Sequence, residues 1–384
     1  MQVTEGIFWF SVLGVFYPYL GYPLILFLLN KKAKTRVVEA SGKAPLSASI
    51  IITCRNEEQV IGTKLDNTLS LKFRQGSVQS EGVEVIVASD ASEDGTDQIV
   101  KEYAQRGVRL IALGERGGKE CAQARALESA RGEIIIFTDA RTRLKDDALE
   151  KALKYFDDKQ IGAVSSMDVL EGDKLSGEGA YVGYEMTLRR IESEFYSLVG
   201  LSGSAFAVRK SICQNLDTTI PSDFACLMKT VKCGYRGKLA EDFVCYYGAL
   251  NSAKAEYKRK VRTVLRGITA LFVCREMMNI KRFGVFSWEL ISHKLCRWLV
   301  PWFIAIAALS LFSLREVAPL YSSFFWIMCA SLLLAALGFA DKTCARSPIC
   351  KIPMFFLLSN AAILHAWIKW LSGKRQVSWT PSDR

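Results

Sequence analysis

Residues 7–29, IFWFSVLGVFYPYLGYPLILFLL, contain no charged side chain, and this run constrains the fold more than any other feature of the chain. A helix that crosses a membrane needs roughly 20 predominantly apolar residues. Pro18 and Pro23 disfavour a helix in water, whereas membrane helices tolerate proline. No Lys or Arg precedes the run, and it is longer than the ~7–15 residues of a signal-peptide core. We therefore expect an uncleaved transmembrane anchor over residues 1–30.

Apolar segments return near the end of the chain. We expect two further spans, at about 298–314 and about 320–340. A fourth segment, 352–371, contains a histidine and a lysine and leaves two alternatives open: a third span, or an interfacial or re-entrant segment. Together these segments predict a C-terminal transmembrane region over 297–372, followed by a basic tail over 373–384.

Basic residues set the expected orientation in the membrane. Four of them follow the first apolar run at once: Lys31, Lys32, Lys34 and Arg36. The positive-inside rule then places the N-terminus outside and residues 31–295 in the cytoplasm. We prefer the interfacial or re-entrant alternative for the fourth segment, which keeps the basic tail inside as well. The expectation is a multi-pass protein of the inner (plasma) membrane with a cytoplasmic middle domain.

The net charge of +11 narrows the class of partner. Lys and Arg cluster beside the membrane segments and in residues 254–266, which suits anionic lipid headgroups and phosphate-bearing substrates. No nucleic-acid-binding motif is present, so we expect no nucleic-acid partner. The 11 cysteines form no CxxC pair and are expected to be reduced packing residues. His293 and His365, the two histidines, are too few for a histidine-based metal site.

The middle of the chain alternates between strand-like and helix-like segments. Four apolar runs predict strands: SASIIITC, VEVIVASD, VRLIAL and EIIIFTDA. Segments with helical periodicity lie between them: EEQVIGTKLDNTLSL, DQIVKEYAQRG and residues 119–130. This alternation predicts an α/β domain with a mostly parallel, Rossmann-like sheet.

Polar residues stand at the carboxyl end of each predicted strand. Arg55 and Glu57 follow the first strand, Asp90 the second, Gly117-Gly118-Lys119 the third and Asp139 the fourth. In parallel α/β sheets, ligands bind beyond the carboxyl ends of the strands. One such aspartate is more often a helix cap or a turn residue. Agreement at four strand ends favours a binding site.

Several segments together resemble the family 2 glycosyltransferases of the GT-A fold. They are SIIITCRNEE, VIVASDASEDGT, GGKECAQARALESARGEIIIFTDA and PSDFACLMKTVKCGYRGKLAED. EYKRKVRTVLRG resembles the (Q/R)xxRW segment of the membrane-integrated branch, and the closing QVSWTPSDR resembles its W-x-P-x-x-R tail. That branch includes cellulose, chitin, hyaluronan and poly-N-acetylglucosamine synthases and ceramide glucosyltransferase. The resemblance implies a GT-A domain over 45–250 and basic amphipathic or interfacial helices over 251–296.

The resemblance implies roles for the strand-end residues in binding a nucleotide-sugar. The family's Asp-x-Asp holds Mg²⁺ or Mn²⁺ against the donor diphosphate, and Asp139 takes the first of these positions. The second carboxylate is replaced by Arg141, which either is solvated or contacts phosphate. Asp90 would contact the nucleotide base or ribose, with Arg55 and Glu57 of the CRNEE segment beside it.

Three further basic residues belong to the expected donor site. Lys119 opens a helix after two glycines, where an anion is favoured, although it has an alternative reading as an ordinary exposed lysine. Arg259 and Arg262 are spaced i, i+3 on one helix face and could grip a diphosphate. The other reading of this segment is a basic amphipathic helix on the membrane surface, and the two readings are compatible. Thr263 stands where the family has its Trp.

On the acceptor side, the resemblance implies that Asp223 is the catalytic base, with Ser222 in the other position of the family's acidic pair. The alternative for Asp223 is a helix cap, and Asp242, after a predicted late edge strand, is the backup base. A small-residue acceptor loop is expected at Ser202, Gly203 and Ser204. Residues 184–195 are expected to form a solvated helix, unless Tyr184 and Glu185 face the acceptor.

The implied function is a membrane-bound inverting hexosyl transfer in cell-envelope glycan synthesis. A sugar would move from a nucleotide-sugar, with UDP the expected carrier, to a lipid or a growing polysaccharide. The alternatives are single transfer instead of polymerisation, and a non-catalytic pseudo-glycosyltransferase subunit of a membrane polysaccharide synthase. Self-association, or partners in a synthase complex, would accompany polymerisation.

Overall fold

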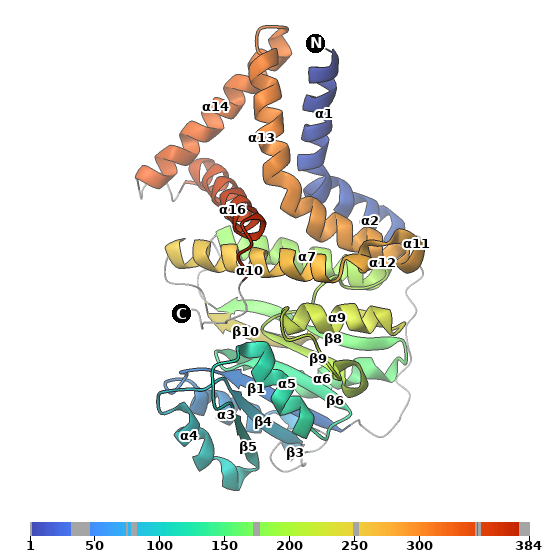
Figure 1. Cartoon of the computed structure of the whole chain (residues 1–384), viewed down its shortest axis with the longest axis vertical. Coiled ribbons are helices and arrows are strands. Elements are labelled where there is room, and N and C mark those ends of the chain that lie inside the picture. The colour runs from blue at the N-terminus through green and yellow to red at the C-terminus, as the bar shows by residue number, and fades with distance from the viewer. Residues whose placement is uncertain are drawn as a thin grey trace.

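A helical region and an α/β domain make up the protein in the computed structural model (Figure 1). The structure describes residues 2–31, 47–73, 76–77, 83–171, 177–248, 253–341, 344 and 347–375. The tail segment QVSWTPSDR and three of the four basic residues after the first apolar run lie outside the described residues.

The α/β domain is built on one eight-stranded sheet with the strand order β5-β4-β1-β6-β9-β8-β10-β7. All four strands predicted from the sequence are confirmed: β1 (Ala48–Cys54), β4 (Glu84–Ser89), β5 (Val108–Ala112) and β6 (Ile134–Asp139). The remaining strands of this sheet are β7 (Thr142–Leu144), β8 (Ile161–Glu171), β9 (Ala205–Arg209) and β10 (Arg236–Gly248). A separate two-stranded ribbon joins β2 (Lys72–Phe73) to β3 (Gly76–Ser77).

The first half of the sheet is parallel, and its register brings the polar strand ends together. β1 pairs with β4 on one side and with β6 on the other. Cys54 lies opposite Ser89, and Thr53 lies opposite Asp139. The residues that follow these strands therefore meet at one edge of the sheet, as the sequence predicts.

The second half of the sheet is mixed. β9 runs antiparallel to both β6 and β8, and β7 runs antiparallel to β10. β10 is paired with β8 as well as with β7, so it is not the edge strand that the sequence suggested. The β8–β10 pairing slips between Ala240 and Val244, which places Asp242 in an irregular stretch.

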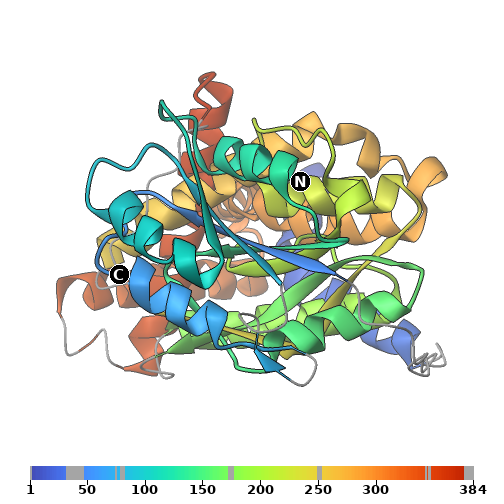
Figure 2. The same ribbon diagram turned by 90° about the horizontal axis from the view of Figure 1, so that it is seen from below.

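Helices cover both faces of the sheet because neighbouring residues of a strand point to opposite faces (Figure 2). On one face, Ile50 and Ile136 pack with α3 (Ile61–Leu69) and α6 (Ala148–Lys154). On the other face, Ile51 and Phe137 pack with α5 (Lys119–Ser129) and α9 (Ser222–Lys232). α4 (Thr96–Glu102) joins β4 to β5, and the short α8 (Lys210–Cys213) follows β9.

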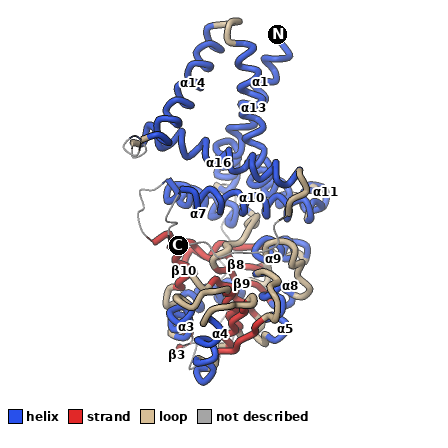
Figure 3. The backbone as a smooth tube through the Cα atoms, turned by 60° about the vertical axis from the view of Figure 1, so that its left-hand side comes forward, coloured by secondary structure: helices blue, strands red, loops and turns tan. Residues whose placement is uncertain are grey.

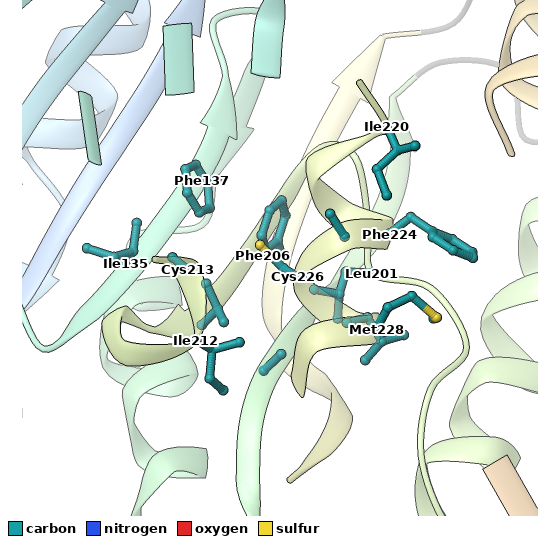
Figure 4. Packing of buried hydrophobic residues seen from close by; sticks show 14 of the residues in the cluster. Ile135, Phe137, Leu201, Phe206, Ile212, Cys213, Ile220, Phe224, Cys226 and Met228 are labelled. Carbon is teal, nitrogen blue, oxygen red and sulfur yellow. The ribbon is translucent and has the colours of Figure 1, made fainter. Parts of the chain in front are cut away.

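An aromatic pair lies at the centre of the second core. The rings of Phe137 and Phe206 are 5.0 Å apart between centroids, and α9 packs beside them with Cys226 and Met228 (Figure 4). Burying a side chain of this size stabilises the fold by roughly 1.5–3 kcal/mol. This packing fixes α9 against the sheet, and with it the first turn of α9 that bears Asp223.

Within the part of the chain that the structure describes, four helices are long and apolar enough to cross a membrane. The first runs from α1 (Gln2–Phe16) through a π-helical segment (Tyr17–Gly21) into α2 (Tyr22–Asn30). The second runs from α12 (Val285–Leu290) through another π-helical segment (Ile291–Cys296) into α13 (Arg297–Leu314). The others are α14 (Pro319–Ala340) and α16 (Pro348–Leu371). The three apolar segments predicted with the N-terminal anchor thus lie in helices, and whether α16 crosses the bilayer stays a prediction.

Two helices lie between the membrane helices and the sheet: α7 (Gly177–Phe195) and α10 (Ala253–Val273), with the short α11 (Ile280–Phe283) beyond them (Figures 1 and 3). α10 packs against α16, while α7 packs against α2 through Leu188. The expectation of a solvated helix over 184–195 is therefore wrong for one face of α7. That face is covered by the membrane helices, whose position the local sequence pattern did not reveal.

Candidate active site

A cavity of about 350 Å³ opens at the carboxyl edge of the sheet. Strand ends form one wall, the loop before β9 and the start of α9 form the second, and α10 forms the third. Among the residues predicted for the site, eight line this cavity: Glu57, Lys119, Asp139, Gly203, Ser204, Asp223, Arg259 and Arg262. The other four are not among its lining residues: Arg55, Asp90, Ser202 and Asp242.

Asp139 forms an ion pair at the end of β6. Its Oδ1 accepts a hydrogen bond from Lys119 Nζ at 2.5 Å, and the same Nζ donates to the Gly203 carbonyl at 3.2 Å. Burial lowers the pKa of Lys119, but the Asp139 carboxylate outweighs it and leaves this pKa raised. Lys119 is therefore charged at neutral pH, and it ties the first turn of α5 to the strand-end wall and to the loop before β9.

Arg141 pairs with Glu57, an arrangement that neither sequence alternative described. Arg141 Nε donates to both carboxylate oxygens of Glu57, at 2.9 and 2.7 Å. Burial raises the pKa of Glu57, and the bond from Arg141 opposes that rise. Arg141 also lines the cavity, so its positive charge stands where the family has a second carboxylate.

Arg55 and Asp90 shape the loops around the wall formed by the strand ends, which we call the donor wall after its predicted role. Arg55 Nη1 donates to the carbonyls of Asp90 and Ala91, at 2.6 and 2.7 Å. Asp90 is fully buried, and its Oδ1 accepts from the backbone N–H groups of Gly117 and Gly118, at 2.8 and 2.9 Å. These bonds position the turn that carries Lys119, and direct contact of Arg55 and Asp90 with a nucleotide stays a prediction.

Asp223 lies inside the first turn of α9 and not at its cap, because the N-cap residue is Pro221. Its Oδ1 accepts from the backbone N–H of Phe224 at 3.0 Å. A Cβ placed on Gly203 would lie 3.7 Å from Asp223 Oδ2, so the carboxylate faces the loop before β9. Glycine at this position leaves open the space in front of the predicted base.

Asp168 is a cavity residue that the sequence analysis did not single out. It lies on β8, and its carboxylate accepts from Ser202 Oγ at 2.8 and 2.6 Å and from Ser166 Oγ at 2.8 Å. Ser202 is buried, so this residue supports the acceptor loop from behind. The available signal was a carboxylate inside the strand, between Met167 and Val169.

α10 contributes a row of side chains to the third wall. Arg259, Arg262, Thr263 and Arg266 all line the cavity. Arg266 was not predicted, although it continues the face of Arg259 two turns later. Its Nη2 forms a 2.5 Å ion pair with Glu120 Oε1 of α5, and both side chains are largely buried. Thr263 lines the cavity at the position where the family has Trp.

Lys64 lies beneath the turn that follows Asp139, and the sequence analysis also passed over it. Its Nζ donates to Thr138 Oγ1 at 3.0 Å and to the Thr142 carbonyl at 2.9 Å. Burial lowers the pKa of Lys64 to about 8.

The backup base, Asp242, lies elsewhere, on the α6 side of β10, with its Oδ2 3.9 Å from Lys151 Nζ.

A divalent cation fits the described residues only if the substrate supplies some of the ligands of the ion. They contain no group of three or more His, Cys, Asp or Glu side chains that could hold a metal ion. Asp139 Oδ1 is bonded to Lys119, which leaves Oδ2 as the carboxylate oxygen of this residue available for an ion. Mg²⁺ is commonly bound through one or two carboxylates together with substrate phosphates and water. The arrangement therefore suits an ion that enters with a diphosphate.

Comparison with known proteins finds a matching family model, related sequences and a related structure. Residues 49–217 match the family model described as Glycosyl transferase family 2. The human dolichyl-phosphate beta-glucosyltransferase is 32% identical over 140 residues, which cover 35% of this chain and 43% of that protein. The poly-beta-1,6-N-acetyl-D-glucosamine synthase of Staphylococcus aureus (strain COL) is 25% identical over 307 residues, covering 74% of this chain and 68% of that protein. The chain thus spans less than half the length of the first of these relatives.

A solved structure matches nearly the whole chain. The mannosyltransferase PcManGT from Pyrobaculum calidifontis, in complex with GDP-Man and Mn²⁺, superposes with a TM-score of 0.75 at 22% sequence identity. The match covers 97% of this chain and 100% of that one. The likeness establishes the GT-A fold of the chain.

Proposed function

We propose that this chain, whose residues 49–217 belong to glycosyl transferase family 2, moves a sugar with inversion from a nucleotide diphosphate donor to a hydroxyl group of a lipid-linked or growing glycan. One observation carries the proposal. One cavity of about 350 Å³ is lined by residues that are far apart in the sequence: Lys119, Asp139, Asp223, Arg259 and Arg262. The same observation disfavours a non-catalytic subunit, because the predicted base and the predicted donor grip are both retained.

The donor diphosphate is held by fixed positive charge. Arg259 and Arg262 project from one face of α10 into the cavity, opposite the Lys119–Asp139 pair. Guanidinium groups bind phosphate oxygens through paired hydrogen bonds, and they stabilise the charge that builds up on a departing diphosphate. Asp139 would hold a divalent ion together with the substrate, and such an ion would supply further charge neutralisation at the leaving group. UDP is the proposed carrier, and either Mg²⁺ or Mn²⁺ suits the oxygen ligands.

Asp223 accepts the proton of the acceptor hydroxyl. As the acceptor oxygen bonds to the anomeric carbon, the bond from that carbon to the diphosphate breaks, and the electron pair leaves with the nucleotide. A phosphate acceptor would bring an oxygen that is already deprotonated and would need no base. The carboxylate in the cavity therefore favours a hydroxyl acceptor over the lipid phosphate named for the dolichyl-phosphate relatives.

The cavity faces the cytoplasm in this proposal. Lys31 follows the first membrane helix at its domain-side end, which supports an N-terminus outside and the α/β domain inside. Reporter fusions at residue 40 that were active only in the periplasm would refute this orientation, and a fusion at the C-terminus decides whether α16 crosses the bilayer.

The decisive experiment replaces Asp223 by Asn. The amide keeps the size of the side chain but cannot take up a proton, so transfer should fall by roughly 10²–10⁴-fold while UDP affinity stays near wild type. Asp242→Asn is the matched control, because Asp242 lies outside the cavity. Purified protein is incubated with radiolabelled UDP- and GDP-sugars and membrane lipids, with thermal melting as the folding control. Near-normal transfer by the Asp223 variant, or loss of transfer in the control alone, would move the base to Asp242.

A further inference from the structure

A buried chain of charged groups lies where α7 meets the first two membrane helices. Glu192 of α7 is fully buried, and its Oε1 accepts from the Tyr22 hydroxyl at 2.7 Å. The same oxygen lies 2.6 Å from His293 Nδ1, and His293 is 1% exposed. Tyr22 belongs to the first membrane helix and His293 to the second, so Glu192 joins both helices to α7.

The chain continues on the other side of the imidazole. His293 Nε2 lies 3.0 Å from Glu185 Oε1, and Arg297 Nη1 donates to Glu185 Oε2 at 2.7 Å. Burial raises the pKa of Glu185, but the charges of His293 and Arg297 outweigh it and hold that pKa well below its usual value. The imidazole of His293 thus lies between the carboxylates of Glu192 and Glu185, and Arg297 closes the far end of the chain.

The helical geometry at this place is specialised. The first membrane helix contains a π-helical turn over Tyr17–Gly21, immediately before Tyr22, and the second contains one over Ile291–Cys296, around His293. Tyr17 and Ser292 connect these turns through hydroxyls 2.8 Å apart. π-Helical turns are rare and frequently occur at functional sites. Charged groups are costly to bury within membrane segments, so their presence there also indicates a functional role.

A link from this chain reaches the active cavity. Arg189 lies on the same face of α7, one turn after Glu185 and one turn before Glu192. It is buried, and its Nη2 donates to the Gly200 carbonyl at 2.7 Å. Gly200 begins the loop that leads into Ser202, Gly203 and Ser204.

The far end of this loop is bonded to the donor wall. Lys119 donates to the Gly203 carbonyl at 3.2 Å, and the backbone N–H of Asp139 donates to the Ser204 carbonyl at 3.2 Å. The backbone N–H of Ser202 is bonded to Ser165 Oγ at 2.8 Å. These bonds hold the Ser202–Ser204 end of the loop to the sheet and the donor wall. The bond from Arg189 holds the Gly200 end.

We propose that Glu185, Glu192 and His293 are positioning residues, which lock α7 against the membrane helices so that Arg189 holds residues 199–204 in the shape that admits the acceptor. None of the four side chains lines the cavity, so none of them touches the reacting groups. The membrane helices would then do more than anchor the enzyme, because they set the acceptor wall opposite Asp223. The structural part of this proposal is independent of the proposed function, and only its catalytic consequence rests on it.

The first test is amide hydrogen exchange of the full-length protein in detergent, without substrate. Arg189→Ala and His293→Gln should each raise exchange across residues 199–204 by roughly tenfold or more, since a hydrogen bond from a charged donor no longer restrains the loop. Arg189→Lys keeps a charged donor and should restore most of the protection. Leu309→Ala is the matched control on the second membrane helix, at a side chain that is 72% exposed. Unchanged exchange in Arg189→Ala, or in His293→Gln alone, would overturn the proposal.

The second test separates positioning from a general loss of structure. Release of free sugar from UDP-sugar into water needs the donor wall but no acceptor, so Arg189→Ala and His293→Gln should keep this hydrolysis near the wild-type rate. Transfer to membrane lipids should fall at least tenfold, through a higher acceptor KM. Equal losses in hydrolysis and transfer would mean a merely structural role and would refute the proposal. Failure of the proposed function is distinguishable, because wild-type protein would then show no transfer while the exchange result still stood.

Discussion

The ion pair between Glu120 and Arg266 is expected to be a principal polar attachment of α10 to the α/β domain. The side chain of Glu120 is 5% exposed and that of Arg266 is 14% exposed, and the pair joins α5 to α10 across the cavity. Glu120→Gln preserves the shape of the side chain and removes its charge. Arg266 then keeps a positive charge in a largely buried place without its carboxylate.

The size of the effect follows from burial. Breaking a fully buried ion pair costs about 3–5 kcal/mol, whereas an exposed pair contributes about 0–1 kcal/mol. Arg266 borders a cavity that water can enter, so the expected loss lies between these limits, at about 2 kcal/mol. For a domain of this size, that loss corresponds to a fall in melting temperature of roughly 4–8 °C. Donor affinity should fall as well, because Arg259 and Arg262 lie on the helix whose attachment is weakened.

The assay is thermal melting of the purified protein in one detergent, with and without UDP. Glu128→Gln is the matched control, since Glu128 lies on the same helix in an exposed pair with Arg125 and should change the melting temperature by less than about 2 °C. The double variant Glu120→Gln/Arg266→Met completes a double-mutant cycle. If its loss equalled the sum of the two single losses, the side chains would not be coupled, and the assignment of this pair as the attachment would be wrong.

Three further predictions concern single residues. Lys64 has a pKa lowered to about 8, so the unfolded chain binds more protons than the folded one between about pH 8 and 10.5; wild-type stability should rise over that window relative to Lys64→Met, and parallel curves would contradict the burial argument. Asp139→Asn should weaken UDP binding in Mn²⁺ but change it little in chelator, and equal losses in both buffers would show that Asp139 acts without a metal. Gly132→Ala should destabilise by about 1–3 kcal/mol, because a Cβ there would lie 2.4 Å from the Ala48 backbone carbonyl carbon, whereas Gly114→Ala meets no atom within 4 Å and should be near neutral in a thermal melt.

The donor wall could be predicted from the sequence because its information is local. An apolar run of strand length followed at once by Asp139 or Asp90 fixes both the strand and the position of the carboxylate at its end. Parallel pairing then brings such ends together without further information. The start of α5 at Lys119, after two glycines, follows from equally local rules.

The supporting residues could not be predicted because their partners are distant in the sequence. Lys64 meets Thr142, Arg266 meets Glu120, and Asp168 meets Ser202 only after the chain has folded. Each appears in its own segment as an ordinary polar residue of a helix or strand. The π-helical turns of the membrane helices carry no local signal that the sequence analysis used, so the buried face of α7 was missed for the same reason.

α10 connects the C-terminal helices to the α/β domain, so both parts contribute to the geometry of the cavity. Its apolar face packs against α16, through Val261, Val264, Leu265 and Ile268 on one side and Ala362, Ile363, Ala366 and Trp367 on the other. Its opposite face carries the cavity arginines, and Arg266 ties that face to Glu120. The apolar face of α10 is thus covered by α16, and contact of this helix with a lipid surface stays a prediction. The helix is held between α16 and α5, so the position of α16 affects where the α10 arginines lie in the cavity.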